Sequence, residues 1–294
     1  MASSYIPDIG EYQKKSKLKN TSFLLIGDLH FQPKNLHESK EFVEKTIKII
    51  KEKKPKNVIL LGDILHTNGD VKLQAYNLAY EFIKQIHELA NLYILIGNHD
   101  MINHTQYRTQ LHMFNSFKHW PHDKYKIIVV DDVINDGNFI FCPYVPKGRF
   151  LEMLNETCKD ESWKDVKAIF AHQDFLGCKD GSYVSIDGEE WDSEFPPIFS
   201  GHIHETQKLG SNVYYTGSAR QNDFGDTSEK RLWMLTFTND EFDEKNIEKI
   251  DLRMKLKKTI IFSIDEVEEK FNEKMCQEYE LKIILIGTPE KHAS

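Results

Sequence analysis

Side chains that can bind metal ions recur at the ends of short apolar runs in this sequence. Each group follows an apolar stretch, and a glycine directly precedes four of the five groups. In chain order they are Asp28 with His30, Asp63, Asn98 with His99 and Asp100, His172, and His202 with His204. Histidine and carboxylate together favour manganese, iron or zinc over calcium or magnesium. The pattern therefore predicts a metal site, and its chemistry would be hydrolysis assisted by bound ions.

Strands and helices that could position these groups alternate in the first part of the chain. Apolar runs predict buried strands at 22–26, 58–61 and 93–96, and amphipathic patterns predict helices at 38–54 and 73–90. This order implies parallel strands joined by helical crossovers. Ligands of open α/β sheets bind outside the carboxyl ends of the strands. We therefore expect the polar groups to meet at one edge of the sheet.

The remainder of the chain is richer in strands. A helix is expected at 104–119, and strands are expected at 127–130, 139–141, 168–171, 198–200, 213–215 and 232–237. The polar, acidic stretch 240–250 predicts a boundary. Beyond it, a strand at 257–262, a helix opened by the capping box Ser263–Glu266 and a strand at 281–286 predict a small β-α-β unit. The fold class is α/β, with an extension at 1–20, a main domain at 21–252 and an appendage at 253–294.

Each polar group by itself also has an ordinary structural interpretation. A Gly-Asp pair is most often a turn, and a single histidine such as His172 is more often a hydrogen-bonded core residue than a ligand. Five groups in this order, each after an apolar run, favour a shared site instead. Asp-x-His and His-x-His would place two side chains on the same side of an extended backbone. The preceding glycines would allow the backbone to turn sharply into the site.

This ordered set of groups resembles the calcineurin-like metallophosphoesterase family over roughly residues 21–240. The resemblance implies a β-sandwich flanked by helices, with a site for two divalent metal ions. It assigns one ion to Asp28, His30, Asp63 and His204, and the other to Asp63, Asn98, His172 and His202. Asp63 would bridge both ions. His99 would be the general acid that protonates the leaving oxygen, steadied by Asp100.

Further motifs resemble the SbcD-type nucleases within this family. After Asp63 the chain reads Ile-Leu-His66, and it lacks the arginine of the GDxVDRG motif of serine/threonine phosphatases. Segment 215–226 contains Gly-Ser and Phe-Gly-Asp, Cys142–Val145 reads Cys-Pro-Tyr-Val, and His172–Gly177 fits an H-x4-G pattern, all as in those nucleases. The resemblance implies a manganese-dependent DNA exo- and endonuclease acting in end processing, recombination or repair. We expect His66 at the rim of the catalytic site, although it could also be an ordinary polar residue at a helix start.

The resemblance also implies partners. DNA would be the substrate, the appendage would correspond to a DNA-capping domain, and helices 73–90 and 104–119 would build a homodimer interface. An SbcC-type ATPase partner would dock on a helical segment further on, for which the chain up to Ser294 offers no obvious candidate. Two other functions stay open. One is a nucleotide or small-molecule phosphodiesterase on the same site, and the other is a non-catalytic scaffold, which the retained ligand types disfavour.

Composition limits the setting in which this protein works. The 294 residues carry a formal net charge of −8, which is not typical of a DNA-binding module. Four cysteines lie far apart, which predicts reduced thiols and an intracellular protein. No apolar run is long enough to cross a bilayer, and no apolar segment follows the N-terminal lysines as in a signal peptide. We expect a cytoplasmic protein, with the nucleus as the alternative.

Overall fold

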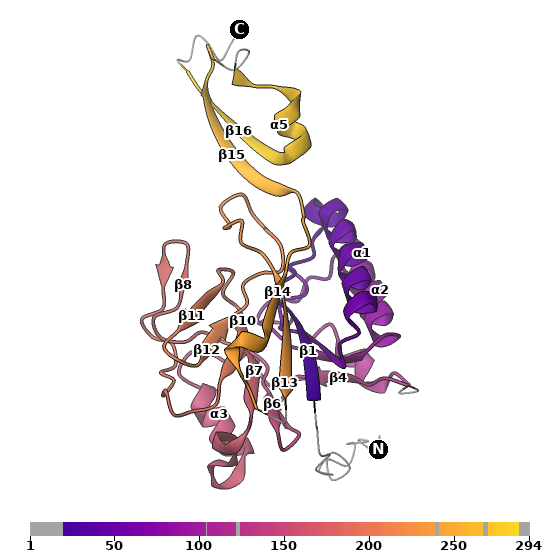
Figure 1. Cartoon of the computed structure of the whole chain (residues 1–294), viewed down its shortest axis with the longest axis vertical. Helices are drawn as coiled ribbons and strands as arrows, with labels where there is room; N and C mark the ends of the chain where they lie inside the picture. The colour runs from indigo at the N-terminus through magenta and orange to yellow at the C-terminus, as the bar shows by residue number, and fades with distance from the viewer. Residues whose placement is uncertain (1–19, 104, 122–123, 239–240, 267–269, 288–294) are drawn as a thin grey trace.

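The computed structural model describes residues 20–103, 105–121, 124–238, 241–266 and 270–287. Its core is a sandwich of two six-stranded sheets, with helices α1 and α2 beside the first sheet and a C-terminal unit projecting from one end (Figure 1). The first sheet has the order β14-β13-β1-β2-β3-β4. Its strands are β1 (Asn20–Ile26), β2 (Asn57–Leu60), β3 (Asn91–Leu95), β4 (Ile127–Val130), β13 (Leu232–Thr238) and β14 (Ile247–Ile250).

The expected parallel arrangement of the first strands is confirmed. β1 pairs in parallel with β2, and β2 with β3, through the crossover helices α1 (Leu36–Lys53) and α2 (Leu73–His87). The apolar face of α1 is buried, including the expected Phe42, Ile47 and Ile50. The helix ends because Lys54 adopts a left-handed conformation and returns its N–H to the carbonyl of Ile50. The two crossovers thus bring the carboxyl ends of three strands to one edge.

The second sheet has the order β11-β12-β10-β7-β6-β5. Its strands are β5 (Ile134–Asn135), β6 (Phe139–Phe141), β7 (Ala168–His172), β10 (Ile198–Gly201), β11 (Gln207–Leu209) and β12 (Val213–Tyr215). A largely aromatic layer fills the space between the sheets; in it the rings of Phe23 and Phe139 are centred 4.9 Å apart. A helix α3 (Phe150–Thr157) and a hairpin of β8 (Lys179–Asp180) and β9 (Tyr183–Val184) complete this half. The fold is the helix-flanked sandwich that the family resemblance implies.

The prediction of a helix at 104–119 is wrong. In the described part of this segment, the only helical element is a single 3-10 turn, η3 (Asn115–His119). The side-chain oxygen of Asn103 accepts hydrogen bonds from the backbone N–H groups of Thr105 and Gln106, and Arg108 has a positive φ of 50°. Polar side chains that bond to nearby backbone compete with helix formation. The apolar spacing reflects Phe114, directly before the 3-10 turn, and Phe117 within it, and both are buried in the core.

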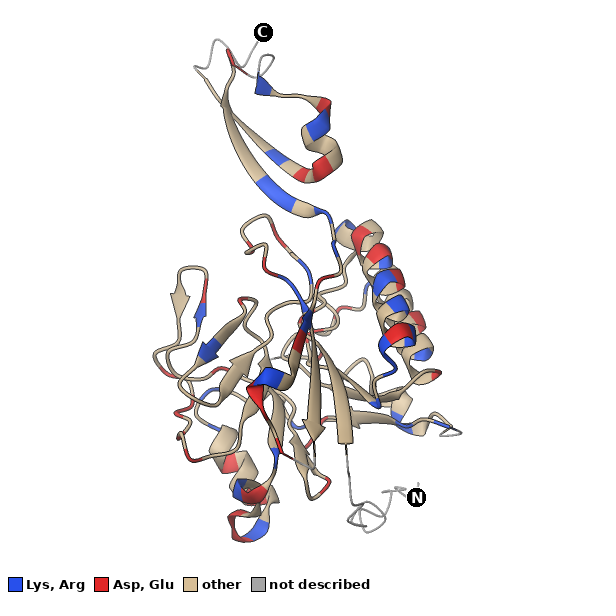
Figure 2. Ribbon diagram, in the orientation of Figure 1, with Lys and Arg blue, Asp and Glu red and all other residues tan. Residues whose placement is uncertain are grey.

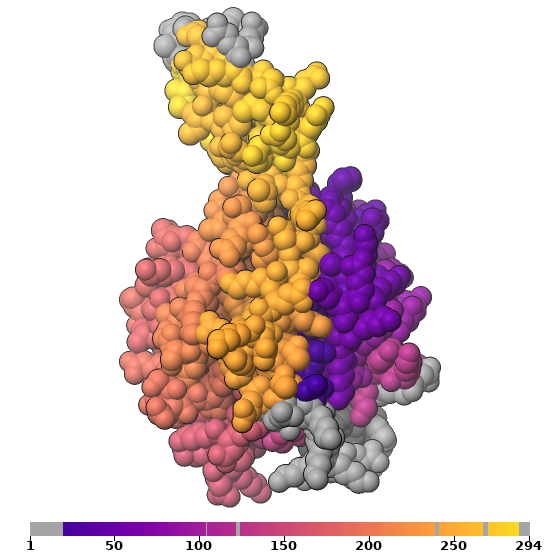
Figure 3. Space-filling view, viewed as in Figure 1, coloured from indigo at the N-terminus to yellow at the C-terminus, as the bar shows by residue number. Residues whose placement is uncertain are grey.

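The boundary expected at 240–250 lies slightly further on. β14 continues the core sheet to Ile250 by pairing antiparallel with β13, although its sequence is polar. Beyond it, β15 (Leu256–Ser263) and β16 (Tyr279–Ile286) pair in parallel around α5 (Glu273–Glu278), which is the expected β-α-β order. Asn272 rather than Ser263 caps α5, and residues 267–269 of the expected helix lie outside the described residues. We call this unit, 256–286, the arm (Figure 3).

Two sequence predictions concern the ends of the chain and the membrane. Of the extension expected at 1–20, all but Asn20 lies outside the described residues, and Asn20 itself begins β1. Within the described residues, no helix has the length and apolarity needed to span a bilayer.

Candidate metal centre

The polar groups identified in the sequence converge at one edge of the sandwich. Loops after β1, β2 and β3 in one sheet meet the ends of β7 and β10 in the other. Three groups of potential ligands have donor atoms within 4.8 Å of one another: Asp28, His30 and His204; His30, Asp63 and His99; and Asp63, His172 and His202. Asp63 and His30 each belong to two groups. The structure therefore brings together side chains that lie up to 176 positions apart in the sequence (204 − 28).

The first part of the cluster lies around His30. Its Nε2 is 3.0 Å from Nε2 of His204 and 3.7 Å from Oδ2 of Asp63. Asp28 is completely buried beside them, and its Oδ1 accepts a hydrogen bond from the backbone N–H of His202 at 2.9 Å. Asp28, His30 and His204 thus form one group of potential ligands, and His30 also faces Asp63.

The second part of the cluster lies around Asn98. Its Oδ1 is 3.0 Å from Nε2 of His172 and 2.9 Å from Nδ1 of His202. His172 Nδ1 is 2.6 Å from the carbonyl of Leu61, to which it donates. Nε2 of the same ring lies 3.4 Å from Asp63 Oδ2, and in the neutral imidazole it would be the nitrogen available to a metal ion. Asp63 therefore lies between the two parts of the cluster, where one carboxylate can serve both.

The backbone that presents these side chains is not extended, contrary to the expectation for Asp-x-His. Asp28, His30, Asp63 and His202 all have positive φ, between 44° and 80°. Non-glycine residues rarely adopt this conformation, and it is concentrated at functional sites. Most of the neighbouring glycines are needed for space and not for a turn. A Cβ on Gly97, for example, would lie 2.2 Å from Oδ1 of Asp63.

Burial and charge act together on the titratable groups. Burial raises the pKa of Asp28 to about 6, and it lowers the pKa of His202 to about 3. Burial would also raise the pKa of Asp63, but the adjacent His172 and His30 outweigh it and hold that pKa well below its usual range. The same Asp63 charge overcomes the burial of His172 and raises its pKa to about 9. Asp63 is thus the most strongly ionised carboxylate of the cluster.

The donor set fits divalent metal ions. Asp28 Oδ2 is buried and has no hydrogen-bond partner among the described residues, so one carboxylate oxygen remains available in the interior. Imidazole nitrogens, carboxylates and an amide oxygen are the ligands that suit manganese, iron and zinc. A bound cation would also stabilise the ionised form of Asp28 against its burial.

His99 and His66 lie together beside this cluster. The ring of His99 donates from Nδ1 to the backbone carbonyl of His66 at 2.7 Å, and the two rings stack 5.7 Å apart at 6°. Nδ1 of His66 is 3.4 Å from Nδ1 of His30. The bond at Nδ1 leaves Nε2 of His99 as the nitrogen that can exchange a proton. The histidine expected at the rim is therefore in contact with the histidine expected to be the acid.

Asp100 acts on the backbone of the loops. It is fully buried, and its carboxylate accepts hydrogen bonds from the N–H groups of Ile64 and Leu65 at 3.0 and 3.1 Å and from Gly97 at 3.1 Å. Asp100 thus connects the loop that carries Asp63 to the loop that carries Asn98. The family resemblance implies that Asp100 steadies His99; the bonds of its carboxylate go to the backbone of the two loops.

The sequence assigned no site role to several residues that surround the cluster. Three of them donate to backbone carbonyls: Asn222 to that of Asp28 at 3.0 Å, buried Arg220 to that of Leu29 at 3.1 Å, and Lys230 to that of His204 at 2.7 Å. Tyr144 packs its ring 5.5 Å from that of His202. The 215–226 and Cys142–Val145 motifs contain three of these four residues, so their motif pattern was a signal, but their bonds depend on the fold.

Comparison with known proteins agrees with this geometry. The sequence profile described as "Calcineurin-like phosphoesterase" matches residues 21–206. The chain belongs to the calcineurin-like phosphoesterase family. It is 39% identical to "Putative phosphoesterase 244L" of Invertebrate iridescent virus 6, over 77% of this chain and 80% of that protein. It is 37% identical to "Putative phosphoesterase 078R" of Invertebrate iridescent virus 3, over 80% of this chain and 68% of that protein.

Among solved structures, TT1561 of Thermus thermophilus is 13% identical, with a TM-score of 0.47, covering 79% of this chain and 99% of that one. As a member of the calcineurin-like phosphoesterase family, the chain is a hydrolase of phosphoester bonds. That family uses a dinuclear metal site, and the described residues supply groups that could hold the ions.

Proposed function

We propose that this phosphoesterase is a manganese-dependent DNA nuclease that hydrolyses phosphodiester bonds in end processing, recombination or repair. The placement of His66 carries this proposal. Its ring stacks on His99 at the metal centre, in the position where the sequence motif departs from that of the serine/threonine phosphatases. A second imidazole beside the proton donor is suited to orienting an additional part of a long substrate.

In this proposal the ligands divide as the family pattern suggests. Asp28, His30, Asp63 and His204 would hold one ion, and Asp63, Asn98, His172 and His202 would hold the other. Two divalent ions in these positions would polarise the phosphoryl group and activate water for in-line attack. The position of Asp63 between both parts of the cluster supports its bridging role.

The chain's own residues would handle the leaving group. His99 is fixed by the carbonyl of His66, so a proton held at Nε2 can pass to the leaving oxygen. Asp100 would keep the loops of Asp63 and Asn98 in register during this step. Each role depends on a rigid support, which is the arrangement that effective catalysis requires.

The remaining features of the proposal concern partners. DNA would be the substrate, the 253–294 segment would act as a capping-like unit outside the 21–252 domain, and an SbcC-type ATPase partner and a cytoplasmic or nuclear location remain predictions. Membership of a hydrolase family and the complete donor set argue against a purely structural scaffold.

Turnover of defined substrates tests the proposal. The protein would be assayed with Mn²⁺ on an end-labelled duplex, on circular single-stranded DNA and on bis(p-nitrophenyl) phosphate, with EDTA and Asp63→Asn as controls. We expect metal-dependent cleavage of DNA. Hydrolysis of the small diester or of nucleotides without cleavage of either DNA would contradict the nuclease assignment and favour a small-molecule phosphodiesterase.

A further inference from the structure

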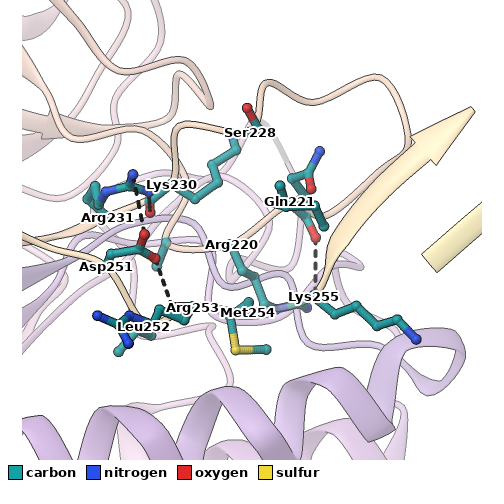
Figure 4. A pocket seen from close by; sticks show the side chains of 12 residues that line it. Arg220, Gln221, Ser228, Lys230, Arg231, Asp251, Leu252, Arg253, Met254 and Lys255 are labelled. Atoms are coloured by element: carbon teal, nitrogen blue, oxygen red, sulfur yellow. Dashed lines mark hydrogen bonds and ion pairs between the residues drawn. The ribbon is translucent and has the colours of Figure 1, made fainter. Parts of the chain in front are cut away.

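A cavity of about 340 Å³ lies where the chain leaves the core sheet for the arm (Figure 4). Its wall is formed by residues 219–221, 228, 230–231 and 251–256. Asp251 is the single acidic residue that lines it. Five lining residues are basic: Arg220, Lys230, Arg231, Arg253 and Lys255. This concentration contrasts with the net charge of −8 of the whole chain (Figure 2).

The positive charge of the cavity is only partly neutralised. Asp251 is occupied, because one oxygen lies 3.4 Å from the guanidinium of Arg231 and the other accepts the backbone N–H of Arg253 at 2.7 Å. Lys230 and Lys255 donate to the carbonyls of His204 and Cys276, which orient the ammonium groups without cancelling their charge. Asp226, 4.0 Å away, offsets part of the charge of Lys230, and Glu38 forms an ion pair with Arg220 at 3.4 Å. The Arg253 guanidinium has no ion-pair partner in the described part of the chain.

Arg220 places a buried guanidinium in the wall of the cavity. Its side chain is 2% exposed, and its terminal nitrogens contact Leu29, Ser39 and Glu38. Its Nε is buried and lacks a hydrogen-bond partner among the described residues. Guanidinium groups match the geometry of phosphate oxygens.

The cavity shares a wall with the metal centre. Arg220 and Asn222 donate to the carbonyls of Leu29 and Asp28, and Lys230 donates to the carbonyl of His204. The segment that lines the cavity therefore also supports the loops of two proposed ligands. A group bound in the cavity would contact the same segment that supports those loops.

We propose that this cavity binds a phosphate group, and that its source is the backbone of a nucleic-acid strand whose scissile bond lies at the metal centre. The choice of source rests on the proposed nuclease function. The cavity has the volume of a small-ligand site, and its cationic side chains suit a phosphodiester, which proteins commonly contact through arginine and lysine. The site would position a strand without reading its sequence.

Binding of a labelled single-stranded oligonucleotide tests this site. Fluorescence anisotropy with the full chain in EDTA, at several KCl concentrations, would compare Arg253→Ala/Lys255→Ala with Lys258→Ala/Lys282→Ala. The control removes the same charge from exposed arm positions outside the cavity. We expect the cavity variant, which loses two charged side chains, to bind at least about 10-fold more weakly, because one hydrogen bond to a charged group contributes about that much. The slope of log K against log salt should fall by about 0.7 per lost contact.

A second variant avoids removing any structural bond. Ser228 is exposed on the cavity wall, and Ser228→Glu would place a negative charge there. We expect this variant to weaken oligonucleotide binding as well, with a melting temperature in phosphate-free buffer equal to that of the unmodified protein.

Thermal unfolding in inorganic phosphate distinguishes the two sources of the phosphate. A site that binds orthophosphate should raise the melting temperature of the unmodified protein, relative to chloride at equal ionic strength, and less so that of the cavity variants. If the cavity variants lose this shift in melting temperature but keep their affinity for the oligonucleotide, the site binds free phosphate. That result would overturn the proposal that a nucleic-acid strand occupies it. Equal behaviour of cavity and control variants in both assays would overturn the site itself. Failure of the unmodified protein to cut DNA would refute the nuclease function, while the orthophosphate result would still decide the cavity.

Discussion

At the scale of single residues, the catalytic edge depends on side chains held in a rare backbone conformation. Asp28, His30 and Asp63 all have positive φ, yet their side chains meet within a few ångströms. Such strain persists only where surrounding contacts maintain it, and here the carbonyls of Asp28 and Asp63 accept hydrogen bonds from Asn222 and His30. Three substitutions separate the roles of the residues at this edge.

Asp63→Asn should reduce metal content more than any other single ligand change. The carboxylate lies between both parts of the cluster, so its loss would weaken both proposed ion sites. Elemental analysis of the purified variant measures the metal-to-protein ratio. Asp70→Asn, at an exposed position, is the matched control. Two tightly retained ions in Asp63→Asn would refute the bridging role.

His99→Ala should retain its metals but lose turnover by about a hundred- to ten-thousand-fold, because a general acid contributes that much. Metal content and DNA cleavage are measured on the same preparation, and exposed His37→Ala serves as the control. Loss of metal together with activity would instead identify His99 as a ligand, which its place beside His30 and Asp63 makes a real alternative.

His66→Ser should keep its metals and depress exonucleolytic release more than endonucleolytic cutting of single strands. The backbone carbonyl that holds His99 remains in the variant, so only the orienting imidazole is lost. Misplacement of a reacting group by about 1 Å can cost a hundred-fold in rate. Kinetics on an end-labelled duplex and a circular single strand compare the two activities. An equal loss on both substrates would assign His66 to the general chemistry.

At the scale of the elements, the loops after β2 and β3 behave as one unit. The Asp100 carboxylate receives N–H groups from both loops, and His99 N–H returns to Asp63 Oδ1 at 2.9 Å. These bonds lie at the carboxyl ends of two adjacent parallel strands, where no ladder partner continues. The position of the candidate metal ligands therefore depends on bonds from side chains of one loop to the backbone of the other.

Asp100→Ala should lower the free energy of unfolding by about 3 kcal/mol, because several buried N–H groups lose their acceptor. Chemical denaturation of the metal-free protein measures the loss without a contribution from bound ions. Exposed Asp165→Ala should change stability by less than about 0.5 kcal/mol. A similar small effect at both positions would mean that water replaces the carboxylate.

At the scale of the whole molecule, apolar side chains remain exposed near the start of α2 and on the neighbouring irregular segment. Leu73 is 71% exposed and Leu111 is 55% exposed, and the segments meet where Gly69 N–H bonds to the carbonyl of Met101. The expected dimer interface included a helix at 104–119 that does not form. Homodimerisation stays a prediction, with the exposed side chains of Leu73 and Leu111 in place of the helix as the expected contact.

We expect light scattering at micromolar concentration to give about twice the chain mass of 34.5 kDa. Leu73→Glu/Leu111→Glu should shift the protein toward the monomer, because charges would be buried at the interface. Ile186→Glu, at a residue that is 85% exposed elsewhere on the surface, should leave the mass unchanged. A monomeric mass for the unmodified protein would contradict dimerisation.

The sequence by itself determined the polar groups that meet and the strands that carry them. Apolar runs of the right length predicted β1, β2 and β3 within a few residues, because burial on both faces leaves a continuous hydrophobic signal. The order of Asp63, Asn98 and His202 after such runs was enough to predict a common edge. The expected helix at 104–119 failed because local bonds from Asn103 are as favourable as helical ones.

Only the tertiary structure decided how the residues support one another. The left-handed backbone at Asp28 and Asp63, the bond from His99 to His66 and the cationic cavity beside the arm all arise from contacts between distant segments. Such contacts depend on the register of the strands and on the conformation of the loops, and neither produces a periodic pattern in a single sequence. Arg220 and Lys257 both meet Glu38 of α1, so the arm and the metal loops share a support that sequence spacing could not reveal.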